Sequence, residues 1–161
     1  MIKKNNKGYA ALELIFYISL FAVLSIAVID SILVMTKTLQ GAKAERELIR
    51  GGEIMERMSR EIRQAKEIVS VQANNLKITV PDGEGEKEIE FKLNNSNLEL
   101  IENHTLTGNL NGPGTLVSSV IFSQINTAKG KAVKISLSIA SKTNQSRSEN
   151  YYNTVNLRGI Y

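Results

Sequence analysis

The 161-residue chain contains no cysteine, only one histidine and only two prolines. Without cysteine there is no disulfide framework, no thiol catalysis and no cysteine-ligated zinc site, so an exported domain must be held together by burial alone. Two prolines and 11 glycines argue against a collagen-like or low-complexity chain. The length allows one domain with at most one long helical appendage.

The net charge of +4 is concentrated at the start of the chain. Lys3, Lys4 and Lys7 all lie within residues 1–8, and the remainder is left near +1 without them. The basic character therefore belongs mostly to a short leader and is not read as a nucleic-acid footprint. No nucleic-acid partner is expected.

A long apolar stretch follows this leader. Residues Ala10 to Ile29 read AALELIFYISLFAVLSIAVI, 20 residues with a single charge, which is enough to cross a hydrocarbon core of about 30 Å. The apolar character continues to Met35 and passes into a charged helical pattern, whereas a discarded export signal normally has a shorter apolar region and a small-x-small cleavage site. We expect a retained membrane helix, with the lysine-rich amino terminus in the cytoplasm.

Glu13 is the unusual residue of this stretch. A carboxylate inside an apolar membrane helix costs about 2.5–3.5 kcal/mol on insertion scales, unless it stays wet near the interface or finds a partner. Glu13 lies five residues after Gly8, which closes the lysine-rich octapeptide. A cut after Gly8 would give Tyr9 a free α-amino group, a cation that can compensate a buried carboxylate.

The run Lys7-Gly8-Tyr9-Ala10-Ala11-Leu12-Glu13-Leu14-Ile15 resembles the processing site of type IV prepilins and pseudopilins. The resemblance implies cleavage after Gly8 by a prepilin peptidase, N-methylation of Tyr9, and docking of Glu13 against the amino terminus of a neighbouring subunit. The implied partners are other pilin or pseudopilin subunits, the peptidase, the membrane and the inner-membrane assembly machinery. Tyr9-Ala10-Ala11 departs from the more usual Phe-Thr-Leu type of sequence.

A second, shorter resemblance is to minor pilins and J-type minor pseudopilins. It lies in residues 55–65, MERMSREIRQA, and in the ending 154–159, TVNLRG, where Gly159 replaces the Asn of those proteins. The expected product is an inner-membrane, single-pass structural subunit with an extracytoplasmic carboxy-terminal domain, belonging to a pilus, a secretion pseudopilus or a DNA-uptake apparatus. The rivals are a filament-tip adhesin or DNA-binding pilin, and a membrane-anchored module that never assembles.

The helical pattern continues beyond the membrane stretch. An apolar stripe recurs at 3-4 spacing, the period of one helix face, at Leu48, Gly51, Met55, Met58, Ile62, Ala65 and Val69. It predicts one helix from about Tyr9 to Ile68, with bending plausible at Gly41 and at Gly51-Gly52. The expected organisation is a leader over 1–8, a membrane and polymerisation helix over 9–35, an amphipathic helix over 36–68 and a sheet region over 69–161. The part from about Arg50 onward is expected to fold alone.

After Ile68 the hydrophobic period changes to two, which predicts strands. These strands are expected at 76–80, 88–93, 98–101, 115–122, 132–139 and 154–160. Turn signals lie at 81–83 and 94–97, and polar loops are expected at 103–114 and 141–153. The pattern predicts an α+β fold, with an antiparallel sheet packed on the second half of a long amino-terminal helix.

Few residues suggest chemistry. His104 lies in a polar segment with no acid or nucleophile placed beside it, so a surface position is expected. The segment 82–86, DGEGE, has too few ligands for a calcium loop and reads as a solvated hairpin tip. Tyr151, Tyr152 and Tyr161, near Arg147 and Arg158, are the candidates for an adhesive or strand-binding patch. We expect no enzyme, catalytic residue, cofactor or metal.

Overall fold

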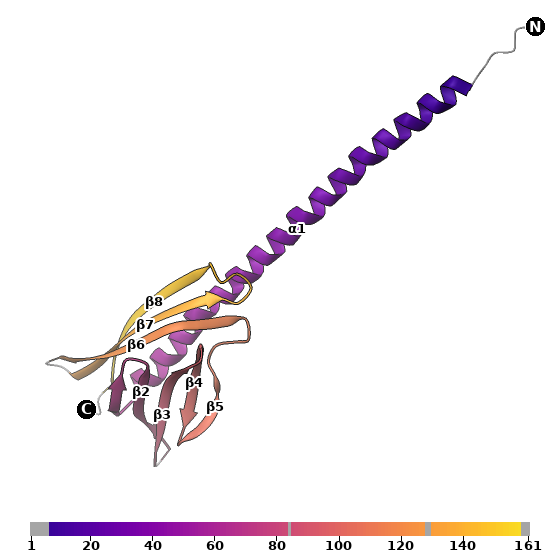
Figure 1. Ribbon diagram of the computed structural model, residues 1–161. Helices are drawn as coiled ribbons and strands as arrows, with labels where there is room; N and C mark the ends of the chain where they lie inside the picture. The colour runs from indigo at the N-terminus through magenta and orange to yellow at the C-terminus, as the bar shows by residue number, and fades with distance from the viewer. Residues whose placement is uncertain (1–6, 84, 128–129, 159–161) are drawn as a thin grey trace, which may run out of the picture. The chain divides into compact units, whose positions relative to one another are not determined.

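The computed structural model describes residues 7–83, 85–127 and 130–158. Within these ranges the chain forms one helix, α1 (Lys7–Gln64), followed by eight strands (Figure 1). The chain divides into two compact units, one ending at Gln40 and one beginning at Gly41, so that α1 contributes to both. Each unit is described by itself below.

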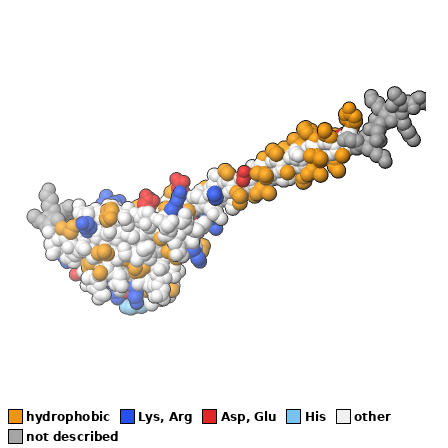
Figure 2. All heavy atoms as spheres, turned by 45° about the horizontal axis from the view of Figure 1, so that its top comes forward, with side chains coloured by type: hydrophobic (Ala, Val, Ile, Leu, Met, Phe, Trp, Pro, Cys, Tyr) orange, Lys and Arg blue, Asp and Glu red, His pale blue; other side chains and the backbone are white. Residues whose placement is uncertain are grey.

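The first unit is the amino-terminal part of α1, whose large apolar side chains are exposed; Figure 2 shows them along one face of the helix. A window of 18 residues here has a mean hydropathy of 2.5, so the helix is long and apolar enough to cross a membrane. The hydroxyls of Ser19, Ser25, Thr36 and Thr38 each donate to the carbonyl oxygen four residues earlier, at 2.7–2.9 Å. These four hydroxyls thus find acceptors within the helix itself, which favours an apolar environment.

The second unit contains two antiparallel sheets (Figure 1). The five-stranded sheet has the order β1-β2-β3-β4-β5, with β1 (Glu67–Gln72), β2 (Asn75–Asp82), β3 (Gly85–Asn94), β4 (Asn97–Glu102) and β5 (Thr105–Asn109). The three-stranded sheet has the order β6-β7-β8, with β6 (Thr115–Thr127), β7 (Gly130–Ser141) and β8 (Ser148–Asn156). The expected α+β fold is confirmed, but the strands form two sheets and not one.

The buried core joins the second half of α1 to both sheets. From the helix it includes Met55, Met58 and Ile62, from the first sheet Phe91, and from the second sheet Ile135. The alternation predicted for β7 is present, with every second residue from Val133 to Ser141 buried. Each sheet turns one apolar face toward α1, so the buried face of the helix is covered by both sheets.

The predicted helix end was wrong by about four residues. Helix α1 ends at Gln64, and Val69, expected in the helical stripe, is half exposed on β1 while Ile68 is buried. The N–H of Lys66 donates to the carbonyl of Thr79 at 2.8 Å, which starts the pairing of β1 with β2. Long-range pairing therefore overrides the helical period at this point.

Several strands also differ from the sequence pattern: β1 was not predicted, and β6 runs to Thr127 and not to residue 122. Strand β5 lies inside the expected loop 103–114, and β8 begins at Ser148, inside the expected loop 141–153. Strand β8 ends at Asn156, short of the predicted 160, while residues 159–160 lie outside the described ranges. The turn at 94–97 is confirmed, with positive φ at Asn95 (46°) and Ser96 (67°), as a two-residue hairpin requires.

Gly51 has a packing role. Helix α1 continues through Gly51 and Gly52, where bending was thought plausible. A Cβ on Gly51 would lie 2.6 Å from Cδ1 of Ile139 and closer still to the ring of Tyr151, whereas a Cβ on Gly52 would meet that ring only at 3.9 Å. Gly51 therefore allows the second sheet to approach the helix backbone.

Candidate functional site

The predicted processing residues Gly8, Tyr9 and Glu13 all lie at the start of α1. The helix begins at Lys7 and has no acidic residue in its first turn, so nothing acidic there opposes the positive end of the helix dipole. Gly8 weakens a helix by about 1 kcal/mol relative to Ala. The Gly8–Tyr9 bond therefore lies in a turn that is inexpensive to unwind. Residues 1–6 of the expected leader lie outside the described ranges.

Glu13 has one hydrogen-bond partner on its own helix. The hydroxyl of Tyr17, one turn later, donates to Oε1 of Glu13 at 3.1 Å. Among the side chains described from Tyr9 to Arg158, no cation lies within ion-pair distance of this carboxylate. Tyr17 was not singled out from the sequence, although its spacing of four residues from Glu13 is the signal that would have identified it.

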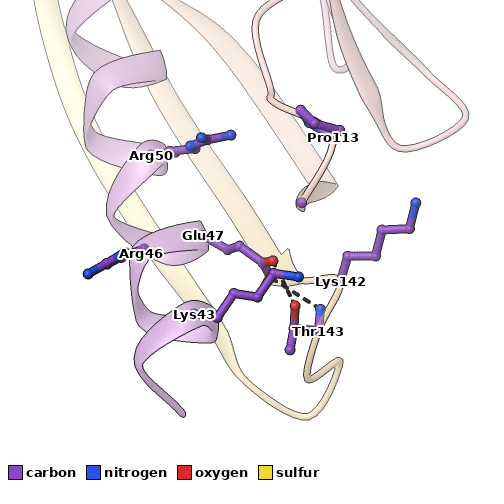
Figure 3. A pocket seen from close by; sticks show the side chains of 8 residues that line it. Lys43, Arg46, Glu47, Arg50, Pro113, Lys142 and Thr143 are labelled. Atoms are coloured by element: carbon purple, nitrogen blue, oxygen red, sulfur yellow. Dashed lines mark hydrogen bonds between the residues drawn. The ribbon is translucent and has the colours of Figure 1, made fainter. Parts of the chain in front are cut away.

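A second polar centre lies around Glu47, on the part of α1 that belongs to the second unit. The Glu47 side chain is only 6% exposed. Its carboxylate accepts hydrogen bonds from Ser141 Oγ at 2.6 Å, from Thr143 Oγ1 at 2.7 Å and from the Thr143 N–H at 3.1 Å (Figure 3 shows the two from Thr143). Its backbone carbonyl accepts from Thr115 Oγ1 at 2.8 Å. Glu47 thus fastens the helix to one end of the β6-β7 pair, where Thr115 and Ser141 lie opposite each other.

Burial raises the pKa of Glu47, but the hydrogen bonds from Ser141 and Thr143, together with the charge of Lys43, outweigh it and lower the pKa below its ordinary value. Hydrogen bonds donated to a carboxylate stabilise its charged form, which accounts for this direction. Glu47 is therefore a buried, ionised carboxylate whose oxygens are already bonded to hydroxyl and amide donors.

A pocket of about 590 Å³ opens beside Glu47. Half of its lining residues are basic. The lining comes from α1 and two connections between strands, namely Lys43, Arg46, Glu47, Arg50, Pro113, Gly114, Lys142 and Thr143. In Figure 3 the Arg50 and Lys142 side chains extend on the side of Pro113, and Lys43 lies next to Glu47, whereas Arg46 points away. None of these four cations forms an ion pair within residues 7–83, 85–127 and 130–158.

Two glycines shape this pocket. A Cβ on Gly114 would lie 2.7 Å from Oε1 of Glu47, and a Cβ on Gly112 would overlap the Arg50 guanidinium. The 112–114 connection is also fixed from behind by buried Asn111, whose Oδ1 accepts from the Leu98 N–H at 2.8 Å. The backbone of this connection can therefore approach the helix closely and forms a wall without side chains at its glycines.

The sequence contained a signal for Glu47 that was not used. Residues 47, 51, 54, 58, 62 and 65 recur at 3-4 spacing and are all buried, so Glu47 is a carboxylate on an otherwise apolar face. Its partners Ser141 and Thr143 are 94 and 96 residues away. No local pattern could have identified them.

The other candidate residues are dispersed. His104 lies in the two-residue turn between β4 and β5, 78% exposed, with Nε2 at 3.4 Å from Oε1 of Glu88. In the 82–86 hairpin Glu86 pairs with Lys66, and Glu84 lies outside the described ranges. The described residues contain no group of three or more acidic or histidine side chains placed to hold a metal ion.

Tyr151 and Tyr152 point in different directions. The Tyr151 hydroxyl donates to the Leu48 carbonyl at 2.8 Å, and burial, helped by Glu149, raises its pKa. Tyr152 is 68% exposed, and Tyr161 lies outside the described ranges. Tyr151 thus attaches β8 to α1, and of the described pair only Tyr152 offers a large exposed ring.

Comparison of the chain with protein-family models, curated proteins and solved structures finds no match.

Proposed function

We propose that this chain is a type IV pilin-like structural subunit, a minor pilin or pseudopilin of a pilus, secretion pseudopilus or DNA-uptake apparatus. It is cleaved after Gly8 by a prepilin peptidase, methylated on Tyr9, and assembled through its helix with other subunits by the inner-membrane machinery. No catalytic role is proposed for any residue.

The observation that carries the proposal is the combination found in the first turns of α1. Apolar side chains surround the helix, and one carboxylate, Glu13, lies five residues after Gly8. Tyr17 supplies a single hydrogen bond to that carboxylate, and no cation is in reach among the described residues. A free amine on Tyr9 of a neighbouring subunit would provide the missing charge.

The cleavage is tested by intact-mass measurement of the membrane-extracted protein. The expected mass corresponds to loss of residues 1–8 and addition of one methyl group. A species that still begins at Met1 in cells with an active prepilin peptidase would contradict the proposal.

The role of Glu13 is tested by comparing sheared-filament and membrane fractions. In Glu13→Ala the free-energy cost of membrane insertion should fall by up to about 3 kcal/mol, because the apolar helix no longer carries this acid. Glu13→Ala should nonetheless be depleted from the filament fraction, since the neighbour's amine loses its partner. Glu13→Gln should be depleted nearly as strongly. Asp30→Ala is the matched control, because it removes a carboxylate of the same helix far from the cut.

Wild-type amounts of Glu13→Ala in the filament fraction would contradict the docking role of Glu13. Absence of the wild-type chain itself from the filament fraction would favour the membrane-anchored module that never assembles. Equal depletion of Asp30→Ala would show that any acid in this helix matters, and would remove the specific docking role of Glu13.

A further inference from the structure

The basic pocket beside Glu47 is not used by the proposed assembly role of the helix. Lys43, Arg50 and Lys142 bring three positive charges to its rim from α1 and from the β7-β8 connection (Figure 3). Each of these residues is exposed, and none forms an ion pair within the described ranges. Like charges held near one another create a local positive potential that attracts anions.

Glu47 does not neutralise this potential in the way an ion pair would. Both of its carboxylate oxygens accept hydrogen bonds from Ser141 or Thr143. Its hydrogen-bonding capacity is thereby used within the pocket wall, and its single negative charge offsets only part of the three positive charges. The three cations therefore keep donors that are free to contact a ligand.

The opposite wall leaves room for such a ligand. It consists of Pro113 and Gly114, next to Gly112, and glycine presents only backbone there. The volume of about 590 Å³ falls in the range of pockets that hold small molecules. A planar guanidinium and two ammonium groups match a phosphate, which arginine binds through two parallel hydrogen bonds and lysine binds as a point charge.

We propose that this pocket binds the phosphate of an anionic phospholipid headgroup. A lipid is the favoured source because Lys43 follows the apolar stretch ending at Met35 by only eight residues. Basic groups within about 10 Å of a membrane surface that contains anionic lipid are attracted to that lipid. The inference rests on the membrane insertion in the proposed function, but not on cleavage or assembly.

The test is native mass spectrometry of the uncleaved full chain in detergent micelles, titrated with phosphatidylglycerol or with phosphatidylcholine. We expect phosphatidylglycerol adducts at concentrations about tenfold lower than phosphatidylcholine adducts. Inorganic phosphate at millimolar concentration should displace the lipid. If inorganic phosphate binds as tightly as the lipid, the lipid source is wrong. Displacement by a short oligonucleotide or an acidic peptide at a lower concentration than phosphate would reassign the pocket to that ligand.

The pocket variant is Lys43→Gln/Arg50→Gln/Lys142→Gln, and the matched control is Arg57→Gln/Lys92→Gln/Lys134→Gln. The control removes the same charge from exposed positions that line none of the described pockets and form no ion pair in the described ranges. The pocket variant should bind phosphatidylglycerol at least about tenfold more weakly, and the control within about twofold of wild type.

Equal weakening in both triple variants would overturn the proposal, since a general charge effect would then explain the binding. Circular dichroism checks that the pocket variant is folded. If it is not, Lys43→Gln/Lys142→Gln, which keeps Arg50 against Gly112, takes its place with the same expected direction. Because the uncleaved chain is measured, failure to assemble into filaments leaves this result unaffected.

Discussion

Replacing Glu47 should destabilise the second unit more than any other change of a charged residue on α1. In Glu47→Ala, Ser141, which is fully buried, and the Thr143 N–H lose their acceptor. Hydrogen bonds to a charged group are worth about 1.5–3 kcal/mol each. Part of the loss of these three hydrogen bonds is offset, because the variant no longer buries a charged carboxylate. We therefore expect the free energy of unfolding to fall by about 3 kcal/mol.

The measurement is thermal unfolding of the full chain in mild detergent, followed by circular dichroism. A loss of about 3 kcal/mol should lower the melting temperature of the second unit by roughly 10 °C. Glu45→Ala is the matched control, because Glu45 is exposed and lies two residues away on the same helix. Glu47→Gln should lie between the two, since its amide keeps one acceptor oxygen but presents donors to the Thr143 N–H.

The pH dependence gives a second readout. Because the folded pKa of Glu47 is lowered, its stabilisation is complete above the ordinary pKa of a glutamate, about 4.3, and is lost as the pH falls through the folded pKa. The difference in melting temperature between wild type and Glu47→Gln should therefore shrink below about pH 4. Equal melting of Glu47→Ala and Glu45→Ala, or a gap unchanged by acid, would refute the assigned hydrogen bonds.

Three further results are expected in the same unfolding assay. Gly51→Ala should lower the free energy of unfolding by about 1–2 kcal/mol because its Cβ overlaps Tyr151, whereas Gly52→Ala should raise it by up to about 1 kcal/mol through helix propensity. If both variants were stabilised, the close approach of the second sheet to Gly51 would be contradicted. Asn111→Ala should lower the free energy of unfolding by about 3 kcal/mol, because the buried amide bonds two groups of β4, one in the turn before β4 and the Thr115 carbonyl of β6; a loss under about 1 kcal/mol would contradict this. A fragment of residues 41–161 should unfold at a higher temperature than one of residues 50–161, since the shorter one lacks Glu47. Equal unfolding midpoints for the two fragments would contradict a unit that begins at Gly41.

Much of the fold could be predicted because its signals are local. The stripe through Met55, Met58 and Ile62 has the helical period, and the alternation in β7 has the period of a strand. The asparagine-rich turn at 94–97 specifies a hairpin through residues that tolerate positive φ. These features required no knowledge of distant residues.

The predictions were wrong where contacts between distant residues determine the secondary structure. Residues 67–68 continue the helical pattern in sequence, but pairing with β2 draws them into a strand. Strand β5 is polar and contains a glycine, so only its pairing with β4 makes it a strand. The division into two sheets and the pocket around Glu47 depend on contacts across about 100 residues, which a one-dimensional period does not encode.

The order of the strands has a consequence for how the chain folds. Every pairing observed joins strands that are adjacent in the sequence, so each sheet can form hairpin by hairpin. Short loops lose little entropy when they close, and topologies built on them fold faster than those built on distant pairings. Because a chain is synthesised from its amino terminus, the five-stranded sheet can form before β6 has been made. Since the chain contains no cysteine, this folding needs no oxidation step and is independent of the redox state of its surroundings.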